Sequence, residues 1–466
     1  MYFCSNKKSK KFNTIYNMDT NHSRRDFLKK SGVGAAGLTI GGVLPGFSAA
    51  GYSRIIGANE RINVAMVGVN SRGEELAINF ARQTSACEVA AICDVDSRAI
   101  EKCVASVRNI QTRAPRGERD FRRALEDRQI DAMVLAMPDH WHAPAALLSL
   151  QAGKHVYLEK PVSYSPREGE MLLEANAKYG KVIQVGTQRR SWPRVAEAVK
   201  LVQEGIIGKV HFGKAWYVNN RQPIGRGTIA AVPEWLDWDL WQGPAPRTAF
   251  RSNLIHYNWH WFWHWGTGES LNNGTHMIDV LCWGMNRTYP TQVSAMGGRY
   301  FHNDDWETPD TQVINLNYGD AQMIWEGYTC SGRQISGTNV GVYFYGDLGS
   351  VYISGGNDFK VYDKRNNVIR EETSNIVIDP LNRVSPASQL DIVHIVNFFD
   401  AIRTGAALAA PIQAGQVCTL LMQLANISIR TGRTLNINPA NGHIINDQEA
   451  QGFWSRSYEP GWEPKV

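Results

Sequence analysis

The chain contains 466 residues, of which 43% are hydrophobic and 20% are charged. This length suffices for two or three domains with sizeable cores, and it excludes a disordered tail, a collagen-like chain and a small disulfide-stapled scaffold. Eight of the 49 basic residues and two of the 44 acidic residues fall within residues 1–50. The net charge of +5 therefore becomes −1 for the rest of the chain, which gives no electrostatic case for binding nucleic acid.

Residues 1–50 have the pattern of an export signal. Ser23-Arg24-Arg25-Asp26-Phe27-Leu28-Lys29 precedes an uncharged stretch rich in Gly and Ala. Gly and Pro interrupt this stretch, which argues against a permanent membrane-spanning helix. The leader resembles a twin-arginine signal, which bacteria read with a receptor. We therefore expect the twin-arginine export machinery to carry the folded protein to the periplasm or the extracellular space; the alternative is two adjacent arginines in a disordered tail.

The cysteines after the leader show neither a C-x-x-C pair nor a regular framework. Several lie among apolar residues, so we predict buried free thiols and no metal site built from them. These residues are Cys87, Cys93, Cys103, Cys282, Cys330 and Cys418.

The first strand-like segment, residues 62–69, runs into a glycine turn and a predicted helix over 74–84. A strand, a tight turn and a helix in this order aim backbone N–H groups at a pyrophosphate. Gly68 and Gly73 occupy the first and last glycine positions of G-x-G-x-x-G, but Asn70 occupies the second. Taken alone, this imperfect fingerprint is weak evidence for nucleotide binding.

A second predicted strand, residues 88–93, ends at Asp94, 26 residues beyond Gly68. A carboxylate at this place accepts hydrogen bonds from the adenosine ribose hydroxyls and repels a 2′-phosphate. Asp94 therefore predicts NAD rather than NADP as the cofactor. The alternative role, capping the next helix, fits Asp96 better.

The strands and helices then alternate as far as residue 186. Predicted strands at 130–136, 155–158 and 181–186 are separated by predicted helices at 143–152 and 168–179. This alternation indicates a parallel, doubly wound α/β sheet. We therefore assign residues 58–186 to an N-terminal Rossmann domain that binds NAD.

Residues 187–466 lack this alternation. Strand-like segments at 210–217, 291–300, 311–318 and 321–329 are expected to lack intervening long helices. We predict a C-terminal α/β domain with a large, mostly antiparallel open sheet, which binds substrate and leaves one face for another copy of the chain. A homo-oligomer is expected.

The segment from residue 219 to residue 265 is long, aromatic and rich in Pro and Gly, which is typical of a functional loop. Trp259, Trp261, Trp263 and Trp265 alternate along it, so two indoles could face a core and two a cleft. Indole faces stack on sugar rings, which favours a carbohydrate site; the alternative is simple loop packing. His260 and His264 stand at metal-ligand spacing, but the alternation argues against a helix there, and we predict no metal.

Several spaced motifs remain to be considered together. They are Asp131 to Pro138, His142, Ala152 to Val156, Glu159-Lys160-Pro161, Gly186-Thr187-Gln188, Asn272 to Asp279, and a late helix containing His394, Asn397, Phe398 and Asp400. In this order they resemble the Gfo/Idh/MocA oxidoreductase family, and the resemblance covers nearly all of the chain after the leader. That family joins a Rossmann domain to an open-sheet α/β domain and acts mostly on sugars, polyols and their derivatives.

The resemblance implies roles for individual residues. Lys160 is expected to reach the substrate hydroxyl and the nicotinamide region, and His276 to be the general acid/base, since imidazole titrates in the useful range. Many relatives carry Asp where this chain has Asn272, so Asn272 is interpreted as a substrate hydrogen-bonder and Asp279 as structural. His142 contacts the nicotinamide ribose or the substrate, or instead caps a helix beginning at Ala143.

The remaining site assignments divide into two groups. On the cofactor side we place Gly68, Asn70, Ser71, Arg72, Gly73, Asp94, Pro138, His142 and Glu159. On the substrate side we place Asn272, Arg189, Gln188 and Trp265.

These assignments predict an exported, NAD-dependent oxidoreductase that acts on a hydroxyl of a sugar, polyol or glycoside. Free NAD is scarce outside the cytoplasm, so the cofactor should travel tightly bound and be regenerated in place. The alternative is an NAD-dependent glycosidase that works by transient oxidation, elimination of the aglycone, addition of water and re-reduction. A third reading is a nucleotide-bound carbohydrate-binding protein without turnover.

Overall fold

The predicted nucleotide-binding half forms a six-stranded sheet in which all neighbouring strands are parallel. The computed structural model describes residues 61–376 and 387–466. The strand order is β3-β2-β1-β4-β5-β6, and the central strands are almost wholly buried because helices cover both faces. The predicted doubly wound sheet is confirmed. Its strands are β1 (Ile62–Val67), β2 (Cys87–Cys93), β3 (Arg116–Glu118), β4 (Ala132–Leu135), β5 (His155–Leu158) and β6 (Ile183–Val185).

The helices of this half follow the predicted order, with one important difference at a boundary. α6 begins at Asp139 rather than at Ala143, because Pro138 precedes it with a φ of −59° that suits a helix start. Asp139 and His142 therefore lie in the first turn of the helix. The helices are α3 (Arg72–Ala81), α4 (Ser97–Arg108), α5 (Arg122–Glu126), α6 (Asp139–Gln151) and α7 (Pro166–Tyr179).

The second half is built on a nine-stranded sheet in the order β14-β13-β12-β11-β7-β10-β9-β8-β15. Only β7 and β10 pair in parallel among its described strands, which confirms a mostly antiparallel sheet. The strands are β7 (Val210–Val218), β8 (Gln292–Gly298), β9 (Thr311–Asn317), β10 (Gln322–Tyr328), β11 (Val340–Gly346), β12 (Gly349–Ser354), β13 (Phe359–Asp363), β14 (Val368–Glu372) and β15 (Leu435–Asn436).

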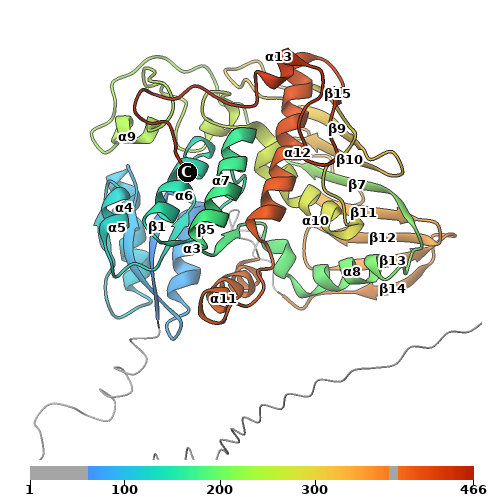
Figure 1. Ribbon diagram of the computed structural model, residues 1–466, viewed down its shortest axis with the longest axis horizontal. Helices are drawn as coiled ribbons and strands as arrows, with labels where there is room; N and C mark the ends of the chain where they lie inside the picture. The colour runs from blue at the N-terminus through green and yellow to red at the C-terminus, as the bar shows by residue number, and fades with distance from the viewer. Residues whose placement is uncertain (1–60, 377–386) are drawn as a thin grey trace, which may run out of the picture. The chain divides into compact units, whose positions relative to one another are not determined.

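The two faces of this sheet differ. α8 (Pro193–Gln203), α10 (Thr275–Met285) and α12 (Ile412–Thr431) pack on one face and enclose the largest apolar core, as Figure 1 shows. On the other face Trp216, Tyr343 and Tyr352 stack on one another. In the described parts of the chain, no helix combines the length and apolar character needed to cross a membrane.

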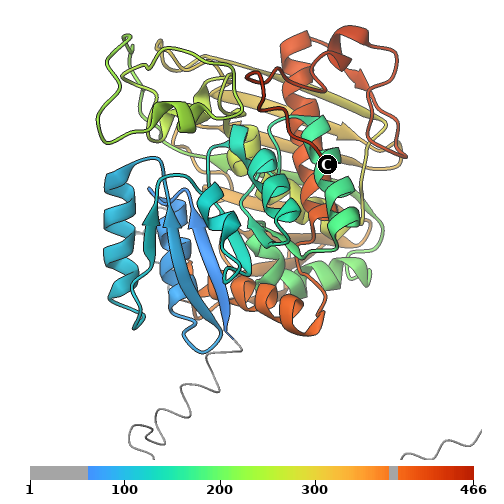
Figure 2. The same cartoon turned by 60° about the vertical axis from the view of Figure 1, so that its left-hand side comes forward.

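One late helix packs on the first sheet rather than the second. Ile395 and Phe398 of α11 (Ser388–Thr404) lie in the same core as β1 and α3, and the two views place α11 beside α3 (Figures 1 and 2). A boundary at residue 187 therefore separates the two sheets, although α11, which follows that boundary in the sequence, packs in the core of the first sheet. The six cysteines named above are buried and free, as predicted, whereas the predicted signal within residues 1–50 lies outside the described residues.

The long segment 219–265 crosses to the nucleotide-binding half. Leu236 forms a β-bridge with Asp96, and the backbone N–H of Asp237 donates to Val95 O at 3.0 Å. The indole of Trp141 donates to Trp241 O at 3.0 Å. The segment contains α9 (Trp238–Gln242) and the 3₁₀ turn η2 (Asn258–Trp261), so the four alternating tryptophans do not form a strand.

The buried imidazole of His394 fastens α11 and makes a pH-dependent contribution to stability. Its ring lies 2.9 Å from Val185 O and 2.6 Å from Ser191 Oγ, and burial lowers its pKa from 6.5 to about 4. Between these values the unfolded chain binds a proton that the folded chain does not. The contribution of His394 is therefore complete above pH 6.5 and is lost as the pH falls toward 4.

We predict that the difference in unfolding free energy between the wild type and His394→Gln changes by about 1.4 kcal/mol per pH unit across that window. The wild type should lose its advantage as the pH falls. Urea unfolding at several pH values measures this difference. His211→Gln, which changes an exposed imidazole, is the control substitution. A pH-independent difference for His394→Gln would contradict the prediction.

Candidate active site

The turn between β1 and α3 is closed tightly by its two glycines. Gly68 has a φ of +79°, and a Cβ there would lie 2.7 Å from Ala136 O. A Cβ on Gly73 would lie 1.8 Å from Gly68 O. Neither position has room for a side chain, and the helix that follows begins at Arg72. The chain therefore builds the backbone cradle that a dinucleotide pyrophosphate requires, although Asn70 replaces one glycine.

A cavity of about 930 Å³ opens at this turn and runs along the carboxyl ends of the first sheet. Its volume lies near the upper end of the range for ligand sites. Both halves of the chain line it, together with segment 219–265. The predicted residues that it brings together are Gly68, Asn70, Ser71, Arg72, Asp94, Pro138, His142, Glu159, Lys160, Gln188, Asn272 and His276.

Asp94 lies at the end of the cavity beyond β2. Its carboxylate accepts hydrogen bonds from the backbone N–H groups of Val69, at 2.6 Å, and Asp96, at 3.0 Å. Burial raises the pKa of Asp94, and these two hydrogen bonds oppose the shift. Asp96 caps α4 by accepting from Arg98 N at 2.9 Å. The structure thus separates the two aspartates as expected, with Asp94 at the cavity.

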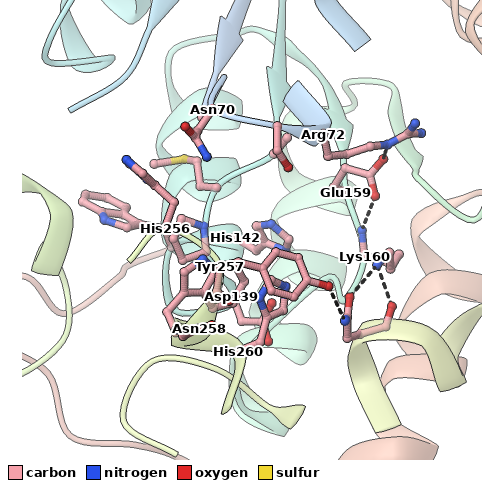
Figure 3. Close-up of a pocket in the computed structure, with 18 of the residues that line it drawn as sticks. Asn70, Arg72, Asp139, His142, Glu159, Lys160, His256, Tyr257, Asn258 and His260 are labelled. Carbon is pink, nitrogen blue, oxygen red and sulfur yellow. Dashed lines mark hydrogen bonds and ion pairs between the residues drawn. The ribbon is translucent and has the colours of Figure 1, made fainter. Parts of the chain in front are cut away.

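Lys160 joins the two halves within the cavity. Its Nζ donates to the backbone O of Asn272 at 2.6 Å and lies 3.3 Å from Asn272 Oδ1, as the dashed lines of Figure 3 show. Burial lowers the pKa of Lys160, and the nearby carboxylates of Glu159 and Asp139 oppose that shift. The ammonium is therefore held at a fixed place between the nucleotide-binding half and the second half.

His276 stands in the first turn of α10, directly after the π-helical turn η3 (Ser270–Gly274). Such π turns occur frequently at functional sites. Burial and then the Lys160 ammonium lower the pKa of His276 well below 6.5, so its ring is neutral at pH 7. Its Nδ1 is buried and has no hydrogen-bond partner. His276 lines the cavity, and a neutral imidazole there can accept a proton from a bound hydroxyl.

His142 lies beside Lys160 in the first turn of α6. Its Nδ1 lies 2.5 Å from Pro161 O, while its Nε2 is buried without a hydrogen-bond partner. The expectation that His142 could cap a helix starting at Ala143 is wrong, because α6 already includes it. Asp139, at the start of the same turn, accepts from both the backbone N–H and the hydroxyl of Thr267. The α6 turn is therefore bound to the second half.

Arg72 and Glu159 line the cavity as an ion pair. Their side chains meet at 2.9 Å, and Arg72 also contacts Asp391 of α11 at 2.7 Å. Despite desolvation, Asp391 and Glu159 raise the pKa of Arg72. Both residues were placed on the cofactor side, and the structure adds that they connect α3 to the late helix α11.

Three predicted residues do not line the cavity. Trp265 is 4% exposed and packs against Trp238 and Trp241, because the turn after η2 directs it into the loop core. Arg189 donates to Gly355 O at 3.1 Å and lies over the Trp192 ring. These two side chains therefore do not reach the cavity, which gives their assignment to the substrate no support. Gly73 lies beneath Gly68 and supports the turn rather than bordering the cavity.

Sequence reasoning missed several cavity residues. Tyr257 OH accepts from Asn272 Nδ2 at 3.3 Å, and the half-buried His260 ring stacks on Trp259 with centroids 3.6 Å apart. Arg221 also borders the cavity and pairs with Glu269 at 2.7 Å. Segment 219–265 has no periodicity that identifies these side chains; only its length and aromatic content signalled it.

His260 and His264, weighed above as a metal pair, bind separate backbone carbonyls. His260 Nδ1 lies 2.7 Å from Tyr257 O, and His264 Nε2 lies 2.9 Å from Pro246 O. Asp279, three residues after His276, forms a buried ion pair with Arg190 at 2.8 Å. Asp279 is therefore structural, as expected.

The parallel sheet, its glycine turn and the shared cavity define a two-domain, nucleotide-binding protein of the oxidoreductase class. The sequence matches the model of the oxidoreductase family with an NAD-binding Rossmann fold over residues 62–187. It matches the C-terminal α/β domain of the same family over residues 194–463. The chain therefore belongs to the Gfo/Idh/MocA oxidoreductase family, and its first domain is an NAD-binding Rossmann domain.

The chain is similar to a glycosyl hydrolase family 109 protein of Saccharopolyspora erythraea, with 29% identity over 43% of this chain and 47% of that protein. It is also similar to an alpha-N-acetylgalactosaminidase of Tannerella forsythia, with 27% identity over 44% of this chain and 46% of that protein. The matched region spans about half the length of these relatives. Among solved structures, levoglucosan dehydrogenase in complex with NADH and levoglucosan superposes with a TM-score of 0.61 at 18% identity, covering 81% of this chain and 99% of the other.

We predict that Asp94→Asn weakens binding of NAD by roughly 10- to 100-fold, the range for losing a hydrogen bond to a charged group, and narrows the preference for NAD over NADP. Titration calorimetry on protein emptied of nucleotide measures both affinities. Asp131→Asn is the control, because Asp131 binds Asn63 N at 2.8 Å and does not line the cavity. Tighter binding of NADP than NAD by the wild type would refute the assignment of Asp94.

Proposed function

We propose that this protein is an NAD-dependent oxidoreductase that acts on a hydroxyl of a sugar, polyol or glycoside. The observation that carries the proposal is the meeting of Lys160 from the Rossmann domain with the η3 turn just before His276, in one cavity beside the glycine turn. NAD, when bound, accepts or returns a hydride at a carbinol carbon. The chain supplies the groups that hold the hydroxyl and move its proton.

His276 takes the proton of the substrate hydroxyl. Its ring is kept neutral by burial and by Lys160, so it needs no deprotonation before it acts near neutral pH. Lys160 orients the same oxygen and favours the developing negative charge, because its ammonium is already fixed on Asn272 O. Asn272, whose amide also reaches Tyr257 and Glu269, positions the lysine.

We also propose that NAD stays bound through turnover. Segment 219–265 lies across the cavity and is tied to the nucleotide-binding half beside Asp94, through residues 235–237, and at α6, through Trp241. A cofactor in this groove would be enclosed by chain from both halves. Release would require these contacts to break, which supports regeneration in place.

A second candidate is an NAD-dependent glycosidase that oxidises a ring hydroxyl transiently, releases the aglycone, adds water and restores the hydroxyl. The similarity to a glycosyl hydrolase family 109 protein and to an alpha-N-acetylgalactosaminidase favours it. Both candidates need the same proton transfer at the first hydroxyl. Products separate them: aglycone release with no net NADH indicates the glycosidase, and a stable keto product indicates the oxidoreductase.

We predict that Lys160→Ala and His276→Ala each lower turnover roughly 10²- to 10⁴-fold, the range for general acid/base groups. The double variant should lose much less than the product of the two, since groups that act on one proton are not additive. Steady-state kinetics on a panel of free sugars and p-nitrophenyl glycosides measures this, and denaturation followed by nucleotide assay measures bound NAD.

His276→Ala should retain its NAD, because His276 is assigned to the substrate. His264→Gln is the control, since His264 binds Pro246 O outside the cavity. Near-normal turnover of His276→Ala would remove this residue from the proposed chemistry.

We propose that the protein reaches the periplasm or the extracellular space folded, through the twin-arginine machinery. The support is the sequence Ser23-Arg24-Arg25-Asp26-Phe27-Leu28-Lys29. We predict that replacing both Arg24 and Arg25 with Lys leaves nearly all of the protein in the cytoplasm, because the receptor reads the guanidinium pair. Cell fractionation measures the distribution, with Lys29→Arg/Lys30→Arg as control. Unchanged export of the Arg24→Lys/Arg25→Lys variant would indicate another route.

We further propose a homo-oligomer through the open face of the nine-stranded sheet. On that face the rings of Trp216, Tyr343 and Tyr352 stack, and Phe212 lies against Tyr345. Within residues 61–376 and 387–466 no helix packs on these rings, and the half-buried Phe212, Tyr343 and Tyr345 on this face would be covered further by a second copy. The mass of the purified protein in solution measures this association.

A further inference from the structure

The outer wall of the cavity, beyond Lys160 and His276, is formed by the end of β7, the residues that follow it, and segment 257–261. Side-chain amides recur along this wall, at Asn219, Asn220, Gln222 and Asn258. Asn272 and Asn273 of η3 add two more amides to the same cavity. Amides donate and accept hydrogen bonds without carrying charge, and they match the hydroxyl and acetamido groups of a neutral sugar.

Arg221 is the charged side chain on this outer wall among the described residues. Its guanidinium meets the carboxylate of Glu269 through two nitrogens, at 2.7 and 3.3 Å. Glu269 is completely buried behind it and does not border the cavity. The paired geometry compensates the charge of Arg221 at the place where it would otherwise face a ligand.

At the inner end of this region the Lys160 ammonium is bound to the neutral Asn272 carbonyl oxygen at 2.6 Å. Burial lowers the pKa of Lys160, and the nearby carboxylates of Glu159 and Asp139 oppose that shift. A carboxylate or phosphate on the substrate would lie near these two carboxylates and would meet an arginine that already has an anionic partner. Leaving such an anion unpaired in a desolvated site is costly.

Aromatic rings complete the outer wall. The Arg221 guanidinium lies 5.2 Å from the Tyr257 ring centroid and 4.9 Å from that of Trp261. Tyr257 remains 44% exposed, so part of its ring is available to the C–H face of a pyranose. Glu269 also accepts from the amides of Asn272 and Asn273, which links the charge pair to the proposed substrate contacts.

We propose that the outer part of this cavity takes an uncharged glycan unit, and that Glu269 determines this specificity by neutralising Arg221. The proposal rests on the proposed function for the reaction itself and adds the class of substrate. Without the Glu269 carboxylate, the Arg221 guanidinium would attract the carboxylate of a uronic acid or the phosphate of a sugar phosphate.

The first test compares matched neutral and acidic probes on the wild-type protein with its NAD in place. Titration calorimetry is run with the methyl glycosides of glucose, galactose, N-acetylglucosamine and N-acetylgalactosamine, and with methyl glucuronide and methyl galacturonide. We expect at least one neutral glycoside to bind ten times or more tightly than its matched uronide. A uronide that binds as tightly as its neutral partner, or more tightly, overturns the proposal.

The second test changes the charge pair. Glu269→Gln should narrow the neutral-to-acidic affinity ratio by tenfold or more, because it exposes the charge of Arg221. Glu269→Gln also removes the carboxylate that accepts hydrogen bonds from Asn272 and Asn273. A purely structural effect of this loss would lower the affinities for neutral and acidic glycosides together. The ratio of the two affinities would then stay unchanged, so this ratio is the readout. The double variant Arg221→Gln/Glu269→Gln, which is again neutral, should restore the wild-type ratio.

Asp305→Asn is the matched control. Asp305 pairs with Arg251 at 2.8 Å and binds segment 219–265 at Gly227, but neither partner lines the cavity. The neutral-to-acidic affinity ratio of Asp305→Asn should equal that of the wild type. An unchanged ratio in a folded, NAD-bound Glu269→Gln protein would refute the role of Glu269.

The binding results distinguish a failure of the carbohydrate function from a failure of the neutral specificity. If the protein holds NAD and binds none of the glycosides, neutral or acidic, the proposed carbohydrate function falls and this inference falls with it. If it binds uronides preferentially, the carbohydrate function stands and only the neutral specificity is wrong.

Discussion

The hydrogen bond from the Lys160 ammonium to the backbone carbonyl of Asn272 is the interaction on which the site depends. It joins the carboxyl end of β5 to the η3 turn, two parts of the chain that are 112 residues apart. A charge removed from water must be given fixed partners, and here the partners come from the second half. The same contact brings His276 close enough for the ammonium to lower its pKa. Binding, proton transfer and the relative position of the two sheets are therefore coupled.

Other contacts make that coupling rigid. Arg72 connects α3 with Glu159 and with Asp391 of α11, and Asp139 holds the α6 turn on Thr267. Segment 219–265 returns from β7 to the edge of the nucleotide-binding sheet. Because these buried charged groups find their partners across the two halves, moving one half against the other would leave such charges unpaired. Such rigidity suits a site in which proton-transfer groups must keep a fixed position.

The local sequence was sufficient for much of the fold. The glycine turn, the alternating strands and helices, and the placement of Asp94 followed from residue spacing, because backbone sterics and periodicity act over a few residues. The start of α6 was harder to predict from the sequence, since Pro138 both ends an extended stretch and directly precedes the helix. The side chain of Trp265 was hard to place for a similar reason: alternation suggested an extended segment, whereas the turn that follows η2 directs that indole into the loop core.

The sequence by itself therefore determined the Rossmann half, the open second sheet, and Lys160 and His276 as the candidate pair. Only the tertiary structure decided what surrounds that pair. Tyr257, Arg221 and Glu269 enter the site through long-range contacts with no sequence period, whereas Arg189 donates to Gly355 O and does not line the cavity. The neutrality of the outer wall depends on a buried carboxylate behind an arginine, and charge compensation of this kind exists only once distant residues have been folded together.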